Sequence, residues 1–228
     1  MKTGTPEWIE LIQKEIKPFG IVINKDQGSS LAFHARELLE WNKKFNLTAI
    51  KDPAEVAVKH FLDSLIPASF ILPDSHLLDI GSGGGFPGIP LAILIPSLQT
   101  LLIDSVRKKV SFLQYVIRSL NLKNAEAIHA RAEELVQNVE FANFFDIIIC
   151  RALTALDRFV LMSQPLLKEN GILIALKGKI NQEEINDVYN LGIKGINIEI
   201  IKYQLPLYKA ERAVVKITMP SSLIHPKP

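Results

Sequence analysis

Apolar positions along the chain follow two different periodicities, and the change between them divides the sequence. In residues 8–16 and again in residues 31–45, apolar side chains recur at the spacing of one helix face. Asp52 and Pro53 then open a third helical run, because Asp is a favourable N-cap and Pro is favourable at the first helical position. We therefore expect a helical extension over residues 1–72.

Short apolar runs alternate with helical stretches from about residue 76 onward. The runs cover residues 77–80, 101–104, 125–129, 145–150 and 172–176. Strands that are buried on both faces have this composition, and their alternation with helices predicts an α/β sandwich with a mainly parallel sheet. Two later β-rich runs, at 196–205 and 213–218, have no helix between them, and we expect them to pair antiparallel at one side of the sheet.

The resulting fold class is α/β, a Rossmann-like three-layer sandwich with a mainly parallel seven-stranded sheet. We assign this domain to residues 73–219 and expect residues 220–228 to form a loose tail. A chain of 228 residues has room for one such domain and an extension. Hydrophobic residues make up 48% of it, which is enough for a sizeable core and argues against disorder.

Cysteine content and hydropathy bear on where the protein works. Cys150 is the single cysteine, so no internal disulfide can form, which fits a reducing compartment. The N-terminus has no apolar core of a signal peptide. The longest apolar run, at 89–98, is short and is broken by Pro90 and Pro96. We therefore expect a cytoplasmic protein with no membrane partner.

Net charge adds little on its own. A formal charge of +2 is too mild to identify a protein that binds nucleic acid. Basic residues do cluster locally, in the stretch from Lys43 to Lys59 and at Arg107, Lys108 and Lys109. Each cluster is also compatible with a solvated helix face, so charge alone leaves the partner open.

A glycine-rich turn, from Asp79 to Gly88, is the strongest local motif. It follows a predicted strand and precedes a predicted helix, where nucleotide-like ligands bind in this architecture. Glycines let the backbone turn sharply and let a ligand approach closely. The turn contains no Gly-Lys-Ser/Thr, so it is not a P-loop, and Ser82 does not stand in the G-x-S-x-G pattern of a nucleophile elbow.

Two ligands compete for this turn. Gly83, Gly85 and Gly88 satisfy the dinucleotide pattern G-x-G-x-x-G, and Asp104 stands about 20 residues further on, as NAD sites require. Asp79, however, would repel a pyrophosphate and attract a cation. The pattern Asp-x-Gly-x-Gly-x-Gly resembles motif I of the class I methyltransferases, whose ligand S-adenosylmethionine is cationic. We favour this cofactor and keep an NAD(P)-dependent oxidoreductase as the alternative.

The ends of the other predicted strands supply further candidates. Asp104 follows the second strand and could accept hydrogen bonds from both ribose hydroxyls. It could also cap the next helix, and the two roles are compatible. Glu133 follows the third strand, where class I methyltransferases place an acidic residue against the adenine amino group, and it is also compatible with a surface role. Arg151 follows the fourth strand, at the carboxyl end where the pocket should lie.

Together these pieces resemble the glucose-inhibited division protein B family, also called ribosomal RNA small subunit methyltransferase G. The matching segments are residues 41–48 (WNKKFNLT), 59–64 (KHFLDS), 79–90 (DIGSGGGFPGIP), 104–109 (DSVRKK), 131–134 (RAEE), 145–146 (FD) with 151–152 (RA), 176–178 (LKG) and 211–215 (ERAVV). They cover most of the chain in the family's order. The first two segments are specific to the family, whereas motif I alone is not.

The resemblance implies a class I methyltransferase that transfers a methyl group from S-adenosylmethionine to N7 of a guanine in 16S ribosomal RNA. The partner would be this RNA or the small ribosomal subunit. Independently of the resemblance, the sequence shows no obvious extra apolar helix face, so we expect a monomer. Together with motif I, the resemblance implies these cofactor contacts: Asp79, Gly81, Gly83, Gly85, Phe86, Asp104, Ala132, Glu133 and Arg151. We expect Phe86 to make a packing or backbone contact.

The acceptor side is less determined by the sequence. N7 of guanine carries a free lone pair, so we expect no metal and no essential general base. His60, Asp63, Ser64 and Arg151 could line the base pocket, and the first three could instead form an interior cluster that braces the helical extension. We expect phosphates to be held by Lys59, Arg107, Lys108, Lys109, Lys177 and Arg212. A non-catalytic module that binds cofactor or RNA remains a third possibility.

Overall fold

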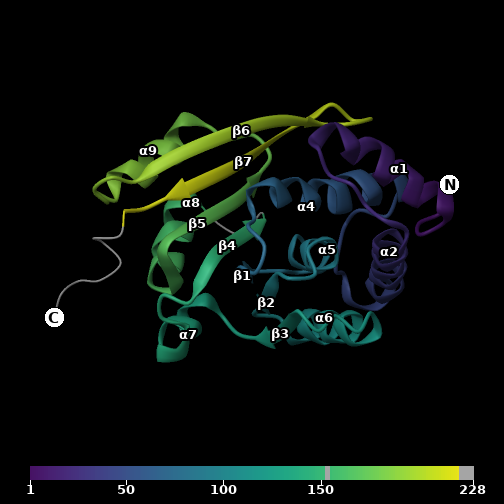
Figure 1. Cartoon of the computed structure of the whole chain (residues 1–228), viewed down its shortest axis with the longest axis horizontal. Helices are drawn as coiled ribbons and strands as arrows, with labels where there is room; N and C mark the ends of the chain where they lie inside the picture. The colour runs from purple at the N-terminus through teal and green to yellow at the C-terminus, as the bar shows by residue number, and fades with distance from the viewer. Residues whose placement is uncertain (152–154, 221–228) are drawn as a thin grey trace.

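A computed structural model describes residues 1–151 and 155–220, and its sheet forms the middle of three layers (Figure 1). The strands are β1 (His76–Ile80), β2 (Gln99–Asp104), β3 (Ala125–His129), β4 (Phe145–Arg151), β5 (Leu167–Lys177), β6 (Asn197–Leu205) and β7 (Ala210–Thr218). They form a seven-stranded sheet in the order β3-β2-β1-β4-β5-β7-β6. The first five strands are parallel, and β7 pairs antiparallel with both β5 and β6.

This topology confirms the predicted mainly parallel sheet with an antiparallel pair at one side. Strand β7 begins at Ala210, earlier than the apolar run predicted, so it continues past the end of β5. The predicted loose tail and Ala152 lie outside the described residues, except for Pro220.

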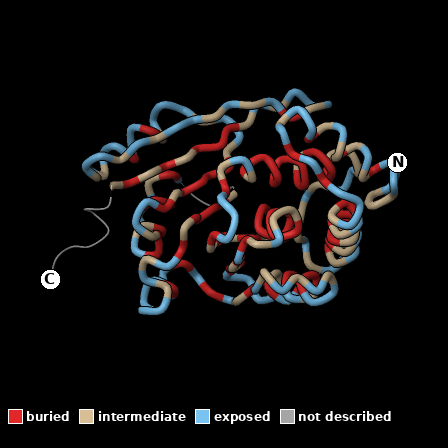
Figure 2. The backbone as a smooth tube through the Cα atoms, viewed as in Figure 1, coloured by how far each residue is buried: buried red, intermediate tan, exposed pale blue. Residues whose placement is uncertain are grey.

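Helices cover both faces of the sheet, each over its own apolar cluster. The face that carries the N-terminal region is covered by α1 (Pro6–Ile16), α2 (Lys25–Phe45), α5 (Gly88–Leu94) and α6 (Arg107–Ser119). The other face is covered by α7 (Ala132–Val136), α8 (Leu156–Ser163) and α9 (Gln182–Asn190). Buried backbone is concentrated in the central strands and in the helices that lie directly on them (Figure 2).

The N-terminal helices share one hydrophobic cluster with α5, α6 and the sheet. Trp8 is fully buried, packs edge-to-face against Phe61 at 5.1 Å, and donates its indole N–H to the Pro53 carbonyl at 2.9 Å. A single apolar cluster runs from these helices into the sheet layer. The N-terminal helices are therefore not a separate unit exposed to solvent. They form part of the layer that supports the glycine turn.

The third helical run begins as the sequence predicts and then changes pitch. Asp52 caps α3 (Pro53–Glu55) by accepting from two backbone N–H groups. A π-helix over Val56–Leu62 follows, and then α4 (Asp63–Leu65). The π-helical turn is wider than an α-turn, and such turns are frequent at functional sites. Among the described residues, no helix is both long and apolar enough to cross a membrane.

Candidate functional site

A cleft of about 470 Å³ opens at the carboxyl ends of β1 to β4, where ligands bind in parallel sheets. Its size lies within the usual range of ligand pockets. The sequence-predicted cofactor residues that line it are Gly81, Asp104, Ala132, Glu133 and Arg151. They come from the ends of different strands, so the sheet topology brings them together. The other predicted contacts, Asp79, Gly83, Gly85 and Phe86, are not among the residues that line the cleft.

The glycine turn presents bare backbone at the mouth of the cleft. Gly83 has φ of +57°, a conformation that strains any residue with a Cβ, and a Cβ there would meet only the Gly81 carbonyl at 3.8 Å. Its N–H donates to Oδ2 of Asp104 at 3.0 Å, which ties the turn to the end of β2. No other atom of the described residues outside its chain neighbours lies within 4 Å of that Cβ position, so a ligand can approach the backbone closely.

Asp79 lies beneath this turn and is fully buried. Its Oδ2 accepts the Gly88 N–H at 2.9 Å, and a Cβ at Gly88 would lie 2.7 Å from the same oxygen, which explains the glycine there. Its Oδ1 has no hydrogen-bond partner among the described residues. Burial raises the pKa of Asp79 to about 7. Asp79 offers no exposed atom to a ligand, so its attraction for a cation acts across the turn.

Asp104 joins the glycine turn to the start of α6 through its carboxylate. Its carboxylate accepts from the N–H of Gly83 at 3.0 Å and from the N–H of Val106 at 2.8 Å, and Lys109 Nζ lies 3.6 Å from Oδ2. The N-cap residue of α6 is Val106, so Asp104 is not the predicted N-cap, although it accepts the N–H of that residue. A carboxylate has about four acceptor positions, so Asp104 can still accept from a ligand. Glu133 is exposed in the first turn of α7, at the rim.

Arg151 is the centre of a polar network at the end of β4. Its Nη1 donates to the Lys59 carbonyl at 3.0 Å, and its Nη2 lies 2.9 Å from Nδ1 of His60. The guanidinium also lies 3.8 Å from Asp63 and 5.0 Å from the Phe86 ring centroid. The π-helix and β4 are therefore joined through one side chain that also lines the cleft.

The contacts of His60 determine its protonation. Because a guanidinium only donates, Nδ1 must accept, so the ring proton is assigned to Nε2, which donates to Thr48 Oγ1 at 2.7 Å. Burial and the charge of Arg151 lower the pKa of His60 to about 3, so the ring is neutral. The ring stacks on Phe86 with centroids 4.7 Å apart. His60 is therefore not available as a general base.

Asp63 and Ser64 face inward from α4. Ser64 is fully buried, and its hydroxyl donates to the His60 carbonyl at 2.6 Å. Asp63 accepts from the Tyr203 hydroxyl of β6 at 2.7 Å and lies 3.8 Å from Nε of Arg212 on β7. Burial raises the pKa of the Asp63 carboxyl and also that of the Tyr203 phenol. Between the two interpretations of this cluster, these contacts favour bracing of the extension over lining of a base pocket.

Sequence reasoning missed His34, a second buried imidazole at the turn. It lies on α2, fully buried, and its Nε2 lies 2.8 Å from the Gly84 carbonyl. Since a carbonyl only accepts, Nε2 carries the proton, and burial lowers the pKa to about 4. The ring stacks on Phe86 at 5.0 Å. The sequence signal that could have identified His34 is its position as a polar residue within the apolar face of the predicted helix at 31–45.

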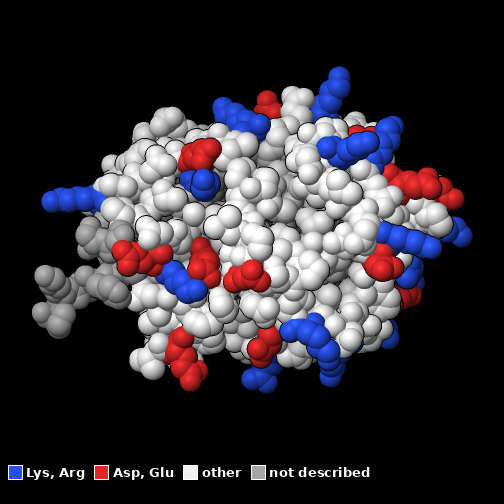
Figure 3. Space-filling model, in the orientation of Figure 1, with Lys and Arg blue, Asp and Glu red and all other residues white. Residues whose placement is uncertain are grey.

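The six basic residues predicted to hold phosphates do not form one free patch. Arg107 and Lys108 are exposed at the start of α6. The other four have acidic neighbours: Lys59 with Glu55, Lys109 with Asp104, Lys177 with Glu184, and Arg212 with Asp63. On the face in Figure 3, basic and acidic side chains are interspersed with broad uncharged areas. Across residues 1–151 and 155–220, no group of three His, Cys, Asp or Glu side chains could hold a metal ion.

Several solved structures with a similar fold are named as methyltransferases. A S-adenosylmethionine-dependent methyltransferase from Aquifex aeolicus matches with a TM-score of 0.54 at 18% identity, covering 75% of this chain and 96% of that one. Fibrillarin from Aeropyrum pernix, in complex with natively bound S-adenosyl-L-methionine, matches with a TM-score of 0.54 at 14% identity, covering 68% and 73%. These matches show that the chain has the fold of the class I methyltransferases, with its cleft at the strand ends where that fold binds ligands.

The sequence comparisons narrow the class to one family. The model of the family rRNA small subunit methyltransferase G matches residues 27–204. A ribosomal RNA small subunit methyltransferase G from Geobacter sp. strain M21 is 39% identical over 214 residues, covering 91% of this chain and 96% of its own. One from Geotalea uraniireducens is 42% identical over 198 residues, covering 86% and 90%. The chain belongs to the rRNA small subunit methyltransferase G family, as its sequence motifs predict.

Proposed function

We propose that the chain transfers the methyl group of S-adenosylmethionine to N7 of a guanine in the 16S RNA of the small ribosomal subunit. The observation that carries this proposal is the cleft at the carboxyl ends of β1 to β4, framed by bare glycine backbone and by the carboxylates of Asp104 and Glu133. Family membership supplies the class of RNA. We expect a monomer that acts in the cytoplasm, where small subunits are assembled.

The residues present fit the cofactor. When bound, S-adenosylmethionine supplies an electrophilic methyl group on a cationic sulfur. Asp104 would accept from the ribose hydroxyls and Glu133 from the adenine amino group. Oδ1 of Asp79 has no hydrogen-bond partner among the described residues, and the pKa of this buried carboxyl is raised. A nearby cation would favour its charged form.

The acceptor requires positioning rather than proton removal. N7 of guanine has a lone pair outside Watson–Crick pairing, so no general base is needed, in agreement with a neutral His60 whose Nδ1 is already occupied by Arg151. Arg151 has further N–H groups that could donate to guanine O6. The base must be unstacked or lie in a loop, because a protein cannot read the deep groove of an RNA helix. Catalysis would then depend on alignment.

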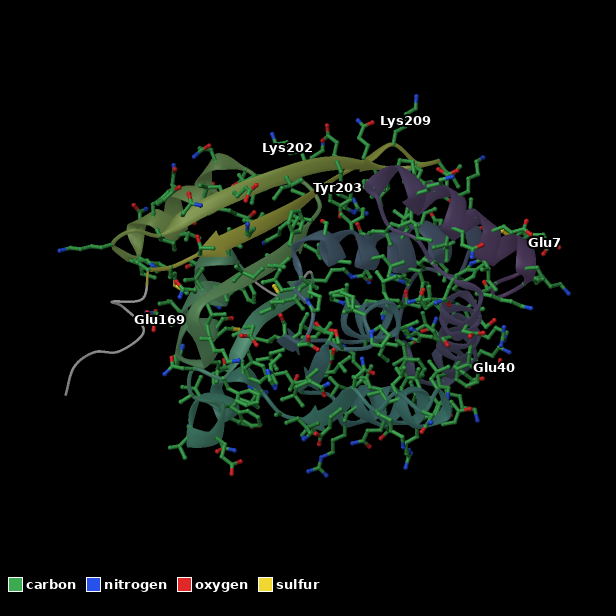
Figure 4. All side chains as sticks on the ribbon, in the orientation of Figure 1. Glu7, Glu40, Glu169, Lys202, Tyr203 and Lys209 are labelled. Atoms are coloured by element: carbon green, nitrogen blue, oxygen red, sulfur yellow. The ribbon has the colours of Figure 1, made fainter. Side chains whose placement is uncertain are left out.

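Cofactor choice separates this proposal from an NAD(P)-dependent oxidoreductase. We expect calorimetry to detect binding of S-adenosylmethionine and no binding of NAD. Asp104→Asn should weaken the cofactor about 10- to 100-fold, because charge-assisted hydrogen bonds to the ribose are lost. Glu169→Gln is the matched control, since Glu169 is exposed on β5 and lies away from the cleft (Figure 4). Binding of NAD alone would contradict the proposal, and cofactor binding without methyl transfer to any RNA would favour a non-catalytic module.

A further inference from the structure

A second hollow lies further along the carboxyl edge of the sheet, beyond β5. Strand β5 ends at Lys177, opposite Ala213, whereas β7 begins at Ala210, so the first residues of β7 extend past β5. The loop from Gly178 to Ile180 follows β5 at this point. Together with residues of β6 and β7 it lines a hollow of about 310 Å³. That volume is at the lower end of the range for ligand sites, and it suits one nucleotide rather than a helix.

The charged side chains around this hollow favour an anion. Lys179, Lys202 and Arg212 line it, and Glu211 is the one acidic residue of the lining. Lys202 is exposed, has no acidic partner among the described residues and points outward from β6 (Figure 4). Lys179 and Glu211 lie 3.8 Å apart but are largely exposed, so their pairing is weak.

The hollow also carries groups that can contact a base. The amide of Gln204 offers both donors and an acceptor, and the carboxylate of Glu211 can accept from an exocyclic amino group. Cations for the backbone and polar groups for the base are among the features by which proteins hold unpaired nucleotides.

The hollow is linked to the cofactor cleft through Asp63. Nε of Arg212 lies 3.8 Å from Asp63 Oδ2, and the same oxygen lies 3.8 Å from Nη1 of Arg151, which lines the cleft. Both cavities open on the carboxyl edge of the sheet. An RNA strand whose target base enters the cleft would therefore pass the hollow with a neighbouring nucleotide.

We propose that this hollow, formed by the loop after β5 and the protruding start of β7, binds an unpaired RNA nucleotide next to the target guanine. Lys202 and Lys179 contact its phosphate, and Gln204 and Glu211 contact its base. The assignment of RNA rests on the proposed function, whereas the binding of an anionic nucleotide rests on the hollow itself.

Two variants test the hollow without touching the cofactor site. Gly178→Phe should fill it, because a Cβ at Gly178 points toward Arg212 Nη1 at 4.0 Å and the backbone there has no positive φ. Lys202→Ala removes one cation, and Lys14→Ala on α1, whose side chain is 82% exposed, is the matched control. The probe is a fluorescent ten-nucleotide single-stranded RNA of mixed sequence, followed by anisotropy over a series of salt concentrations.

We expect Gly178→Phe to weaken binding of the probe about tenfold and Lys202→Ala about fivefold. Lys202→Ala should also lower the slope of log K against log salt by about 0.7, the value for one phosphate contact on a single strand. Lys14→Ala should match the wild type. Affinity for S-adenosylmethionine should stay unchanged in all three variants, which shows that they fold, and KM for ribosomal RNA should rise in the first two with little change in kcat.

The outcomes separate the hollow from the proposed function. Equal affinity of the wild type, Gly178→Phe and Lys202→Ala for the probe, with methylation of ribosomal RNA intact, would overturn the hollow as an RNA subsite. Failure of the wild type to bind the probe would overturn it too. Binding of the probe through the hollow with no methyl transfer to any RNA would support the subsite and contradict the proposed function.

Discussion

Asp79 is a buried carboxyl at the end of β1 with one oxygen bonded to the Gly88 N–H and the other unpartnered among the described residues. Its pKa is raised from 3.8 to about 7, first by burial, while the Gly88 N–H and Arg151 act in the opposite direction. The folded protein therefore binds this proton more tightly than the unfolded chain does. Stability from this group is fully present below about pH 4 and is lost as the pH rises through about 7.

The variant Asp79→Asn tests whether the buried charge of Asp79, which lowers stability at neutral pH and above, contributes to cofactor binding. At pH 8 we expect the cofactor-free protein to become more stable, on the order of 1–3 kcal/mol, because Asn keeps the acceptor for Gly88 without a buried charge. Affinity for S-adenosylmethionine should fall about tenfold, because the attraction for the cation is removed. Thermal melts at pH 6 and pH 8, with and without cofactor, measure both effects. A variant that is less stable at pH 8 and binds cofactor normally would contradict this role.

Helix α2 and the π-helix hold the glycine turn from the side opposite the cleft. His34 on α2 bonds to the Gly84 carbonyl, and both His34 and His60 stack on Phe86. Arg151 links the π-helix to β4. The elements of residues 1–72 are therefore part of the support of the cofactor site, even though they contribute no residue to its lining.

Replacing His34 with Phe tests this support. His34→Phe keeps an aromatic ring near Phe86 but removes the hydrogen bond to Gly84, so we expect a loss of about 1–2 kcal/mol in the free energy of unfolding. Cofactor affinity should fall several-fold because the turn loses an anchor. Gln13→Leu is the control, since it removes the hydrogen bond to the Ile23 carbonyl within the N-terminal helices, away from the turn. Equal cofactor affinity of His34→Phe and the control would show that α2 does not position the turn.

Elements and strand-end residues were predictable, whereas contacts between distant elements were not. Asp104 and Glu133 follow apolar runs, and the parallel topology then requires them to lie at one edge. The bond between Tyr203 and Asp63 joins positions 140 residues apart, and no local pattern encodes it. Helix α9 was not assigned either, because only Ile185 and Val188 of its residues are buried and its apolar stripe is thin.

Over the whole molecule, the basic residues are dispersed rather than gathered into one field. The net charge of +2 agrees with this distribution. We therefore expect contact with RNA to depend on a few local groups, around the cleft and around the hollow. Arg107 and Lys108 are the exposed pair nearest to Asp104 in sequence.

Charge reversal at Arg107 and Lys108 tests whether these two residues contact RNA. We expect Arg107→Glu with Lys108→Glu to raise KM for ribosomal RNA at physiological salt, with cofactor affinity unchanged, since Lys109 beside Asp104 is retained. The slope of log K for RNA binding against log salt should fall in magnitude by about 1.4–1.8, the value for two phosphate contacts. Lys14→Glu with Lys17→Glu on the N-terminal helices is the matched control. Unchanged RNA methylation in the variant with Arg107→Glu and Lys108→Glu would show that these residues do not contact the RNA.

Methyl transfer to ribosomal RNA can be measured directly with small ribosomal subunits from cells that lack this gene. Purified protein and labelled S-adenosylmethionine are added to the subunits and, in parallel, to their deproteinised RNA, and the modified nucleotide is mapped. We expect a single 7-methylguanosine in the 16S RNA and loss of transfer in Asp104→Asn. No transfer to subunits or to free RNA, with S-adenosylmethionine still bound, would contradict the proposed function.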